Sequence, residues 1–335
     1  MDIITLAHGS GGKATHSLIK DVFYKHFKND ILLQQKDSGI LQNLNGKIAV
    51  TTDSFVVKPI FFHGGDIGKL SVCGTVNDLA VCGAKPLYIT VGFIIEEGLK
   101  IDVLEKITKS MAKTAEKTEI KIVAGDTKVV EKGKADKIFI NTTGIGLIED
   151  NQIDLSINRI KEGDKVILSG TLGDHGMCIM NSRGELGLDA YIKSDCCLLN
   201  TLIRDILKIS KNIKFMRDPT RGGLATTLNE IIENSNNSIV LNEGDIPIKK
   251  KVMSMCELLG FDPLYVANEG KIVVIVSDND ADIVLKIMRK NPLGKDSKII
   301  GRVINDGNNR VYLKTEIGGT RMLNMLSGEL LPRIC

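Results

Sequence analysis

The chain is predicted to form two domains of mixed helix and strand, on three observations. Apolar runs typical of strands alternate with amphipathic helical patterns along the whole sequence. A polar stretch from Asn151 to Gly163 interrupts this alternation, and a strand followed by a glycine-rich loop begins after it. The length of 335 residues also fits two domains better than one. These observations place the domains at 1–155 and 156–325, followed by a tail at 326–335.

Periodicity predicts the individual elements. In the first domain, runs of strand-forming residues predict four strands, and apolar residues at helical spacing predict an amphipathic helix. In the second domain, the apolar run KIVVIVS is typical of a buried strand. The predicted strands are 46–57, 85–95, 120–126, 136–148 and 271–277, and the predicted helices are 101–120, 196–210, 222–235 and 281–290.

Composition excludes several classes of function. The chain has 44 basic and 41 acidic residues, a net charge of +3, and 4% aromatic residues. A nucleic-acid-binding protein would gather basic and aromatic residues on one face, whereas the charges here are interspersed. The chain contains no apolar run of the ~18 to 20 residues that a membrane helix needs, and its start lacks the basic and then apolar order of a secretory signal. We therefore expect a cytoplasmic protein.

Cysteine usage points to the end of the chain. The seven cysteines form no CxxC pair suited to zinc. Cys73 and Cys82 lie in apolar stretches and are predicted to pack in the core. The last residue, Cys335, follows ELLPRI and has no apolar segment around it with which to be buried, and Pro332 disfavours a helix there. The sequence therefore predicts an exposed, reactive thiol, which is either incidental or functional.

The glycine-rich start HGSGGKATHS does not fit a P-loop. That motif requires a glycine five positions before Gly12, where Ala7 stands, and Ser or Thr after Lys13, where Ala14 stands. We expect a flexible loop in which the backbone N–H groups of Gly11 and Gly12 and the Lys13 ammonium bind an anion. A disordered N-terminus remains an alternative.

Aspartates at strand ends and turns indicate a nucleotide site. Asp53, Asp78 and Asp126 stand in the strings VTTDSF, TVNDLAV and VAGDTK. Magnesium prefers carboxylates together with phosphate oxygens and water, so three such aspartates in one domain favour a magnesium–nucleotide site over helix caps or turns. In RDPTRGGLAT, Asp218 and Arg221 precede a helix start and form a candidate anion contact, with a capped helix as the alternative.

These motifs together resemble the HypE family of hydrogenase maturation proteins. The resemblance extends from His8 to Cys335. Its glycine and aspartate motifs also occur in aminoimidazole ribonucleotide synthetase, selenophosphate synthetase and thiamine monophosphate kinase, and the closing PRIC separates HypE from these relatives. The strings that carry it are AHGSGGK, TTDSFVV, VNDLAVCGAKPL, AGDTKVV, FINTTGIG, RDPTRGGLAT, ANEGK and PRIC.

The resemblance implies a two-domain α+β fold of the PurM-like type. The N-terminal domain would bind ATP and have a mixed sheet that pairs with the sheet of a second subunit, so we expect a homodimer with ATP near its interface. The C-terminal domain would be α+β, and the tail would be flexible.

The resemblance also implies an activity. A partner carbamoyltransferase, HypF, would load a carbamoyl group onto Cys335. ATP-dependent dehydration would convert this group to a thiocyanate, and a HypC–HypD complex would receive the cyanide for a [NiFe]-hydrogenase. The rival interpretations are a small-molecule kinase of the same superfamily and a non-catalytic carbamoyl or cyanide carrier.

Site roles carried over from the family complete the expectation. Asp53, Asp78 and Asp126 would bind Mg²⁺ and through it the ATP phosphates. Glu269, in YVANEGK, would be the base, although a solvated loop glutamate is the plain alternative. Lys134 would stabilise charge near the tail and lower the pKa of the terminal thiol, with Lys128 and Lys132 as nearby alternatives.

Overall fold

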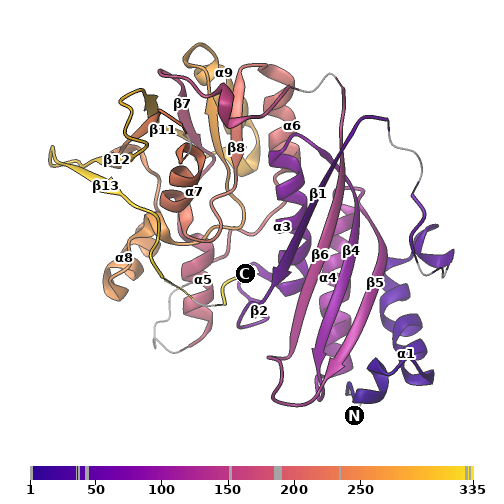
Figure 1. The fold of residues 1–335 in the computed structure, drawn as a ribbon. Helices are drawn as coiled ribbons and strands as arrows, with labels where there is room; N and C mark the ends of the chain where they lie inside the picture. Colours follow the sequence, from indigo (N-terminus) through magenta and orange to yellow (C-terminus); the bar gives the residue numbers. More distant parts are fainter. Residues whose placement is uncertain are drawn as a thin grey trace.

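The computed structural model describes residues 3–34, 36, 38–41, 45–150, 153–184, 191–233, 235–328, 331 and 333–335. Pro332, which is predicted to keep the tail from forming a helix, lies outside the described residues. The described chain forms two domains that lie side by side, each with its own sheet (Figure 1). The sequence-based prediction of two mixed domains is therefore confirmed.

A four-stranded mixed sheet forms the N-terminal domain. Its order is β1-β6-β4-β5, in which β4 and β5 are parallel and the other neighbours antiparallel. Side chains alternate along β4, so Ile89, Val91, Phe93 and Ile95 all point to one buried face. Helices α3 and α4 cover that face (Figure 1). The bounds are β1 Lys47–Phe55, β4 Lys85–Glu96, β5 Lys121–Val130, β6 Ile138–Ile148, α3 Ile67–Val81 and α4 Ile101–Glu116.

The opposite face of this sheet is exposed in the single chain. Apolar side chains lie on it, and Val50 is 65% exposed, with Ile48 and Ile94 also exposed. The register places Val50 beside Ile145 on the neighbouring strand, so these residues form one apolar surface. A patch of this kind on a sheet face is typical of an association surface.

Short elements precede and connect the strands of this domain. The predicted glycine-rich N-terminal loop continues directly into a short helix that begins at Lys13. The N-terminal elements are a 3₁₀ helix Leu6–Gly9, α1 Lys13–Leu18, a π-helical segment Ile19–Tyr24, α2 Lys25–Phe27 and a 3₁₀ helix Leu32–Gln34, and a small hairpin joins β2 Phe61–Phe62 to β3 Gly65–Asp66.

A seven-stranded mixed sheet forms the C-terminal domain, with the order β13-β12-β9-β11-β7-β10-β8. The bounds are β7 Lys165–Leu168, β8 Ile213–Arg217, β9 Ser238–Asn242, β10 Val273–Val276, β11 Lys298–Ile304, β12 Val311–Lys314 and β13 Thr320–Leu323. The helices are α5 Asp174–Ser182, α6 Asn200–Ile209, α7 Gly223–Ile232, α8 Lys250–Leu259 and α9 Asp278–Lys290, with 3₁₀ turns at Ile157–Arg159, Glu243–Asp245, Pro263–Tyr265 and Pro292–Gly294.

Strand β10 explains why the sequence shows an unbroken apolar run. Val273 and Ile275 pack with α7 on one face of the sheet, and Val274 and Val276 pack with α6 and α9 on the other. A strand that is covered on both faces has apolar side chains on both, so apolar and polar residues do not alternate along it. The prediction of a buried strand is confirmed.

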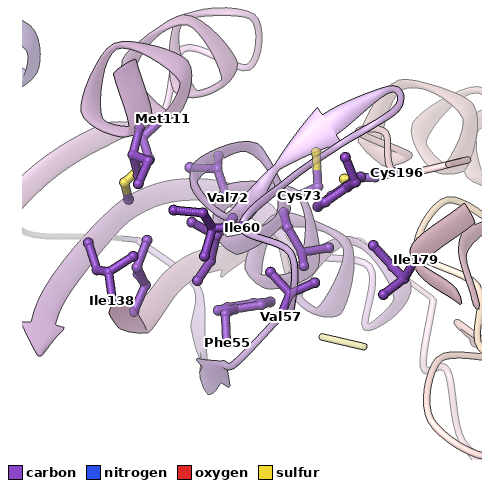
Figure 2. Close-up of a cluster of buried hydrophobic side chains, with 14 of the residues drawn as sticks. Phe55, Val57, Ile60, Val72, Cys73, Met111, Ile138, Ile179 and Cys196 are labelled. Carbon is purple, nitrogen blue, oxygen red and sulfur yellow. The ribbon is translucent and has the colours of Figure 1, made fainter. Parts of the chain in front are cut away.

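The two domains share a hydrophobic core. Phe55, Val57 and Cys73 of the N-terminal domain pack in one cluster with Ile179 and Cys196 of the C-terminal domain (Figure 2). The prediction that Cys73 is buried is confirmed.

Two sequence-based predictions differ from the structure. Cys82 is exposed, because it follows the last residue of α3 where that helix opens onto the space between the domains. The helix predicted at 196–210 begins only at Asn200. None of the described helices is long and apolar enough to span a bilayer.

Candidate active site between the domains

A cleft of about 700 Å³ lies between the two domains. One wall is formed by β1 and the C-terminal half of α3, and the other by the end of β8 and the turn that leads into α7. Of the predicted site residues, Asp53, Asp78, Asp218 and Arg221 line it. Residues 165 positions apart in sequence therefore share one cavity.

Three carboxylates gather in this cleft. Alternation along β1 turns Thr51 and Asp53 toward α3, which carries Thr75 and Asp78 one turn apart. The Thr51 hydroxyl donates to Asp78 Oδ2 at 2.8 Å, and the Thr75 hydroxyl donates to Asp53 Oδ2 at 3.4 Å. Asp218 joins them from the other domain, directly after β8.

The carboxylates perturb one another. Burial, and then the nearby Asp78, raises the pKa of Asp53 to about 6. Burial, and then Asp78, raises the pKa of Asp218 to about 7, and burial also raises the pKa of Asp78. Since burial and the neighbouring carboxylates disfavour the ionised form, a cation bound in the cleft would stabilise it. Among the described residues, however, no three acidic, histidine or cysteine side chains lie close enough to hold a metal by themselves.

The Gly-Gly turn before α7 places Arg221 in the cleft. Gly222 and Gly223 have φ of +76° and +62°, and a Cβ on Gly223 would lie 2.5 Å from the Leu264 carbonyl oxygen. Only glycine fits this sharp entry to the helix. The turn directs Arg221 Nη2 to within 3.7 Å of Cys335 Sγ.

The end of the chain docks beside the cleft, where Arg221 contacts the Cys335 sulfur. The N–H of Val56 donates to the Cys335 main-chain oxygen at 3.0 Å, and Ile334 is 6% exposed within the shared core. The expectation that Cys335 has nothing with which to be buried is therefore wrong. Apolar residues from distant segments supply the packing that the local sequence lacks.

Glu269 is buried beside this cysteine. It is 4% exposed and follows a tight turn before the strand β10. Its backbone N–H donates to Asp195 Oδ1 at 3.1 Å, and Asp195 Oδ2 accepts from Gly270 N at 3.2 Å and from Lys271 Nζ at 2.9 Å. The plain alternative of a solvated loop glutamate is wrong.

Sequence reasoning did not find Asp195. It stands in KSDCC, more than 70 positions before the loop that it holds, and no local pattern signals this role. The side chains of Asp195 and Lys271 are both buried, so this ion pair holds the loop that carries Glu269 in place.

The pKa values of Glu269 and Cys335 are both raised. Burial, and then the Cys196 thiol and the Asp218 carboxyl, raises the pKa of Glu269 well above its usual range. Burial, and then Glu269, raises the pKa of the Cys335 thiol to about 11, although Arg221 opposes this. The expected lowering of the thiol pKa is therefore wrong for the docked tail.

The remaining predicted residues lie elsewhere. Lys134 is exposed in the turn between β5 and β6. Its backbone N–H donates to the main-chain oxygen of Glu131. The contacts of the described residues include none between Lys134 and Cys335.

Asp126 is separated from the other two predicted metal ligands. It pairs across the sheet with Gly92 on the exposed face, whereas Asp53 points to the helix-covered face three strands away. Thr15 of α1 lines a pocket with Asp126, so the Gly11, Gly12 and Lys13 segment lies on the Asp126 side of the domain. Within one chain, Asp53, Asp78 and Asp126 therefore do not form one site.

Comparison with known proteins identifies the family of the chain. The AIR synthase related protein family matches through its N-terminal domain at 35–148 and through its C-terminal domain at 161–314. The carbamoyl dehydratase HypE of Bradyrhizobium diazoefficiens is 48% identical over 333 residues, which cover 99% of this chain and 96% of that protein.

Solved structures extend the likeness to three dimensions. A crystal structure of hydrogenase maturation protein HypE in complex with ATP has a TM-score of 0.93 at 45% identity and covers 98% of this chain and 99% of its own. HypE in a crystal structure of a HypE–HypF complex has a TM-score of 0.80 at 48% identity, covering 92% of this chain and 100% of its own. The present chain belongs to the HypE carbamoyl dehydratase family of AIR synthase related proteins.

Proposed function

We propose that this chain is an ATP-dependent carbamoyl dehydratase that acts on an S-carbamoyl group carried by its own Cys335, for the maturation of [NiFe]-hydrogenases. The observation that carries the proposal is the position of the Cys335 sulfur, which lies at the edge of the acidic cleft, 3.7 Å from Arg221 and near Glu269. A small-molecule kinase of the same fold would have no use for a thiol held there.

The chemistry explains why ATP is needed. The oxygen of an amide is a poor leaving group, and transfer of the γ-phosphoryl group of ATP to it converts it to phosphate. Breaking the carbon–oxygen bond then releases phosphate, and the two nitrogen protons are lost as the nitrogen forms a triple bond to carbon. The products are a thiocyanate on Cys335, ADP, phosphate and a proton.

The residues of the cleft have distinct roles in this reaction. Once ionised, Glu269 is a strong base because of its raised pKa, and it takes the nitrogen protons. Arg221, 3.7 Å from the sulfur, is placed to stabilise negative charge on the amide oxygen as it is phosphorylated. Partial burial of Cys335 limits the access of water to the reacting group.

The acidic cluster fits a divalent cation that brings phosphate oxygens as further ligands. Burial, and then the charge of Asp78, raises the pKa of Asp53 and of Asp218, and a bound cation would stabilise their carboxylates. When bound, Mg²⁺ supplies charge neutralisation for the phosphates of ATP. The cluster holds too few ligands to bind a metal without the nucleotide.

A homodimer would complete the nucleotide site. Asp126 lies on the other face of the sheet from Asp53, and Thr15, close in sequence to Gly11, Gly12 and Lys13, lines a pocket with it, so these residues join the cluster only if a second chain provides them. The exposed apolar face with Val50 and Ile94 is the surface for that association. Val50→Asp should shift the mass measured by sedimentation toward the monomer, and an unchanged mass would exclude this face.

The raised pKa of Cys335 separates loading from dehydration. A thiol with a pKa of about 11 is a poor nucleophile at neutral pH, so the docked tail is not the state that accepts the carbamoyl group. We infer that the tail moves out to HypF for loading and returns for dehydration. The HypC–HypD complex would then take the cyanide.

Intact-mass measurement tests the function. The protein is incubated with HypF and a carbamoyl donor and then with ATP, and we expect carbamoylation of Cys335 followed by loss of one water. Carbamoylation that ATP never converts would favour the carrier. Turnover of a free small molecule by Cys335→Ala would favour the kinase.

A further inference from the structure

The tail is held by the segment that follows β1. Residues 56–58 continue beyond β1, and the tail runs antiparallel to them. The Val56 N–H donates to the Cys335 oxygen at 3.0 Å, and the Lys58 N–H donates to the Arg333 oxygen at 3.1 Å. Extended peptides bind to open strand edges in this manner, and the backbone bonds fix their register.

The guanidinium of Arg333 has its own partner. Its Nη1 donates to Asp136 Oδ2 at 2.7 Å, and Lys58 Nζ lies 3.7 Å from the same oxygen. Asp136 belongs to the β5–β6 connection, which is otherwise remote from the tail in sequence. Asp136 and Arg333 are only partly exposed, so their pair is stronger than a free surface pair.

The backbone around Ile334 is held from the other domain. His175 of α5 is fully buried, with Nε2 2.9 Å from the Ile334 oxygen and Nδ1 2.8 Å from Ser194 Oγ. Burial lowers the pKa of His175, so the neutral ring donates from Nε2 and accepts from the serine hydroxyl. Arg183, after the same helix, donates to the oxygens of Lys58 and Arg333 at 3.1 and 3.3 Å.

We propose that Asp136, His175 and Arg183 form a receptor site for the segment Arg333-Ile334-Cys335, in which Asp136 reads the arginine side chain and His175 sets the register of the backbone. These are positioning residues, because none of them contacts the sulfur. The site takes a peptide whose arginine stands two positions before its cysteine. The proposal rests on the proposed function, since it concerns how that substrate is presented.

The receptor explains how the sulfur reaches its place. Arg333 and Ile334 are held on opposite sides of the strand pair, so a shift by one residue would separate Arg333 from Asp136. With both held, Cys335 Sγ lies beside Arg221 and Glu269.

Charge exchange in the full-length chain tests the role of Asp136. The readout is the rate at which iodoacetamide alkylates Cys335 at pH 8 without ATP or carbamoyl donor, measured by peptide mass. Asp136→Arg and Arg333→Asp should each raise this rate, by up to about a hundredfold, since release would return the thiol pKa from about 11 toward 9.0. The double variant should restore slow alkylation. Unchanged rates in both single variants, or no restoration in the double variant, would overturn the proposal.

His175→Phe tests the second contact. The substitution removes the donor to Ile334 and keeps a ring of similar size, and it should speed alkylation of Cys335. Cys178, buried on the same helix, is the internal control for local unfolding and should stay protected. Equal acceleration at Cys178 would mean that the helix, not the receptor, was lost. Failure of dehydration with intact protection of Cys335 would count against the proposed function alone.

Discussion

Asp53 offers a measurement of how burial and the nearby Asp78 disfavour a carboxylate in the cleft. Its pKa is 3.8 ordinarily and about 6 in the folded chain, because burial and Asp78 disfavour the carboxylate. The folded state therefore binds this proton more tightly than the unfolded state does. As pH rises from 3.8 to 6 the folded state loses stability, and at about 1.4 kcal/mol per pKa unit the loss reaches roughly 3 kcal/mol.

Asp53→Asn removes this pH-dependent cost. Relative to the unmodified chain, the free energy of unfolding of the variant should increase by up to about 3 kcal/mol between pH 4 and pH 7.5. Losses of packing or of the Thr75 hydrogen bond shift the comparison equally at both pH values. Urea unfolding followed by far-ultraviolet circular dichroism is the assay, because the chain has no tryptophan. Asp282→Asn, exposed on α9, is the matched control and should show no such pH dependence.

Nucleotide should reverse the comparison. Magnesium and ATP at about 100 times their dissociation constant would stabilise the unmodified chain by about 2.7 kcal/mol, and the variant should gain much less. A stability difference that stays flat with pH, or one that falls above pH 6, would refute the raised pKa of Asp53. Equal stabilisation of both proteins by magnesium and ATP would refute the role of Asp53 in binding.

Three further outcomes are expected. Glu269→Gln should leave carbamoylation of Cys335 intact and reduce dehydration at least a hundredfold, as shown by accumulation of the carbamoylated mass; normal dehydration would remove Glu269 as the base. Arg221→Met should slow alkylation of Cys335 at pH 9, because the guanidinium lowers the pKa of that thiol, and a faster reaction would contradict this contact. Asp195→Asn should destabilise the chain by about 3 to 5 kcal/mol in urea, because it leaves the buried Lys271 ammonium without its partner, and a loss below about 1 kcal/mol would show that the pair is not needed.

The sequence predicted elements wherever one short segment contains the signal. The run KIVVIVS predicted β10, and the Gly-Gly pair before LATTLNEII predicted the start of α7, because burial and backbone conformation act residue by residue. Cys82 was misplaced because burial at the end of a helix depends on what packs there. No local pattern reports that environment.

The candidate site was predicted in part. Six site residues were named from the sequence. Asp53, Asp78, Asp218 and Arg221 line one cleft. Glu269 and Cys335 lie beside it, close to one another. Asp126 was grouped with them because its context looked alike, but strand order and alternation place it on the other face. Asp195 and the direction of the Cys335 pKa depend on groups far apart in the chain, so they required the three-dimensional structure.

The buried side chain of Ile334 makes the tail a removable part of the protein interior. When the tail leaves, a hole opens in the core that both domains share, and withdrawal of an isoleucine from such a site costs roughly 2 to 3 kcal/mol. A partner that loads Cys335 must therefore provide an apolar pocket of its own that binds the Ile334 side chain. Because the returning side chain refills this cavity, re-docking of the loaded tail would be energetically favoured.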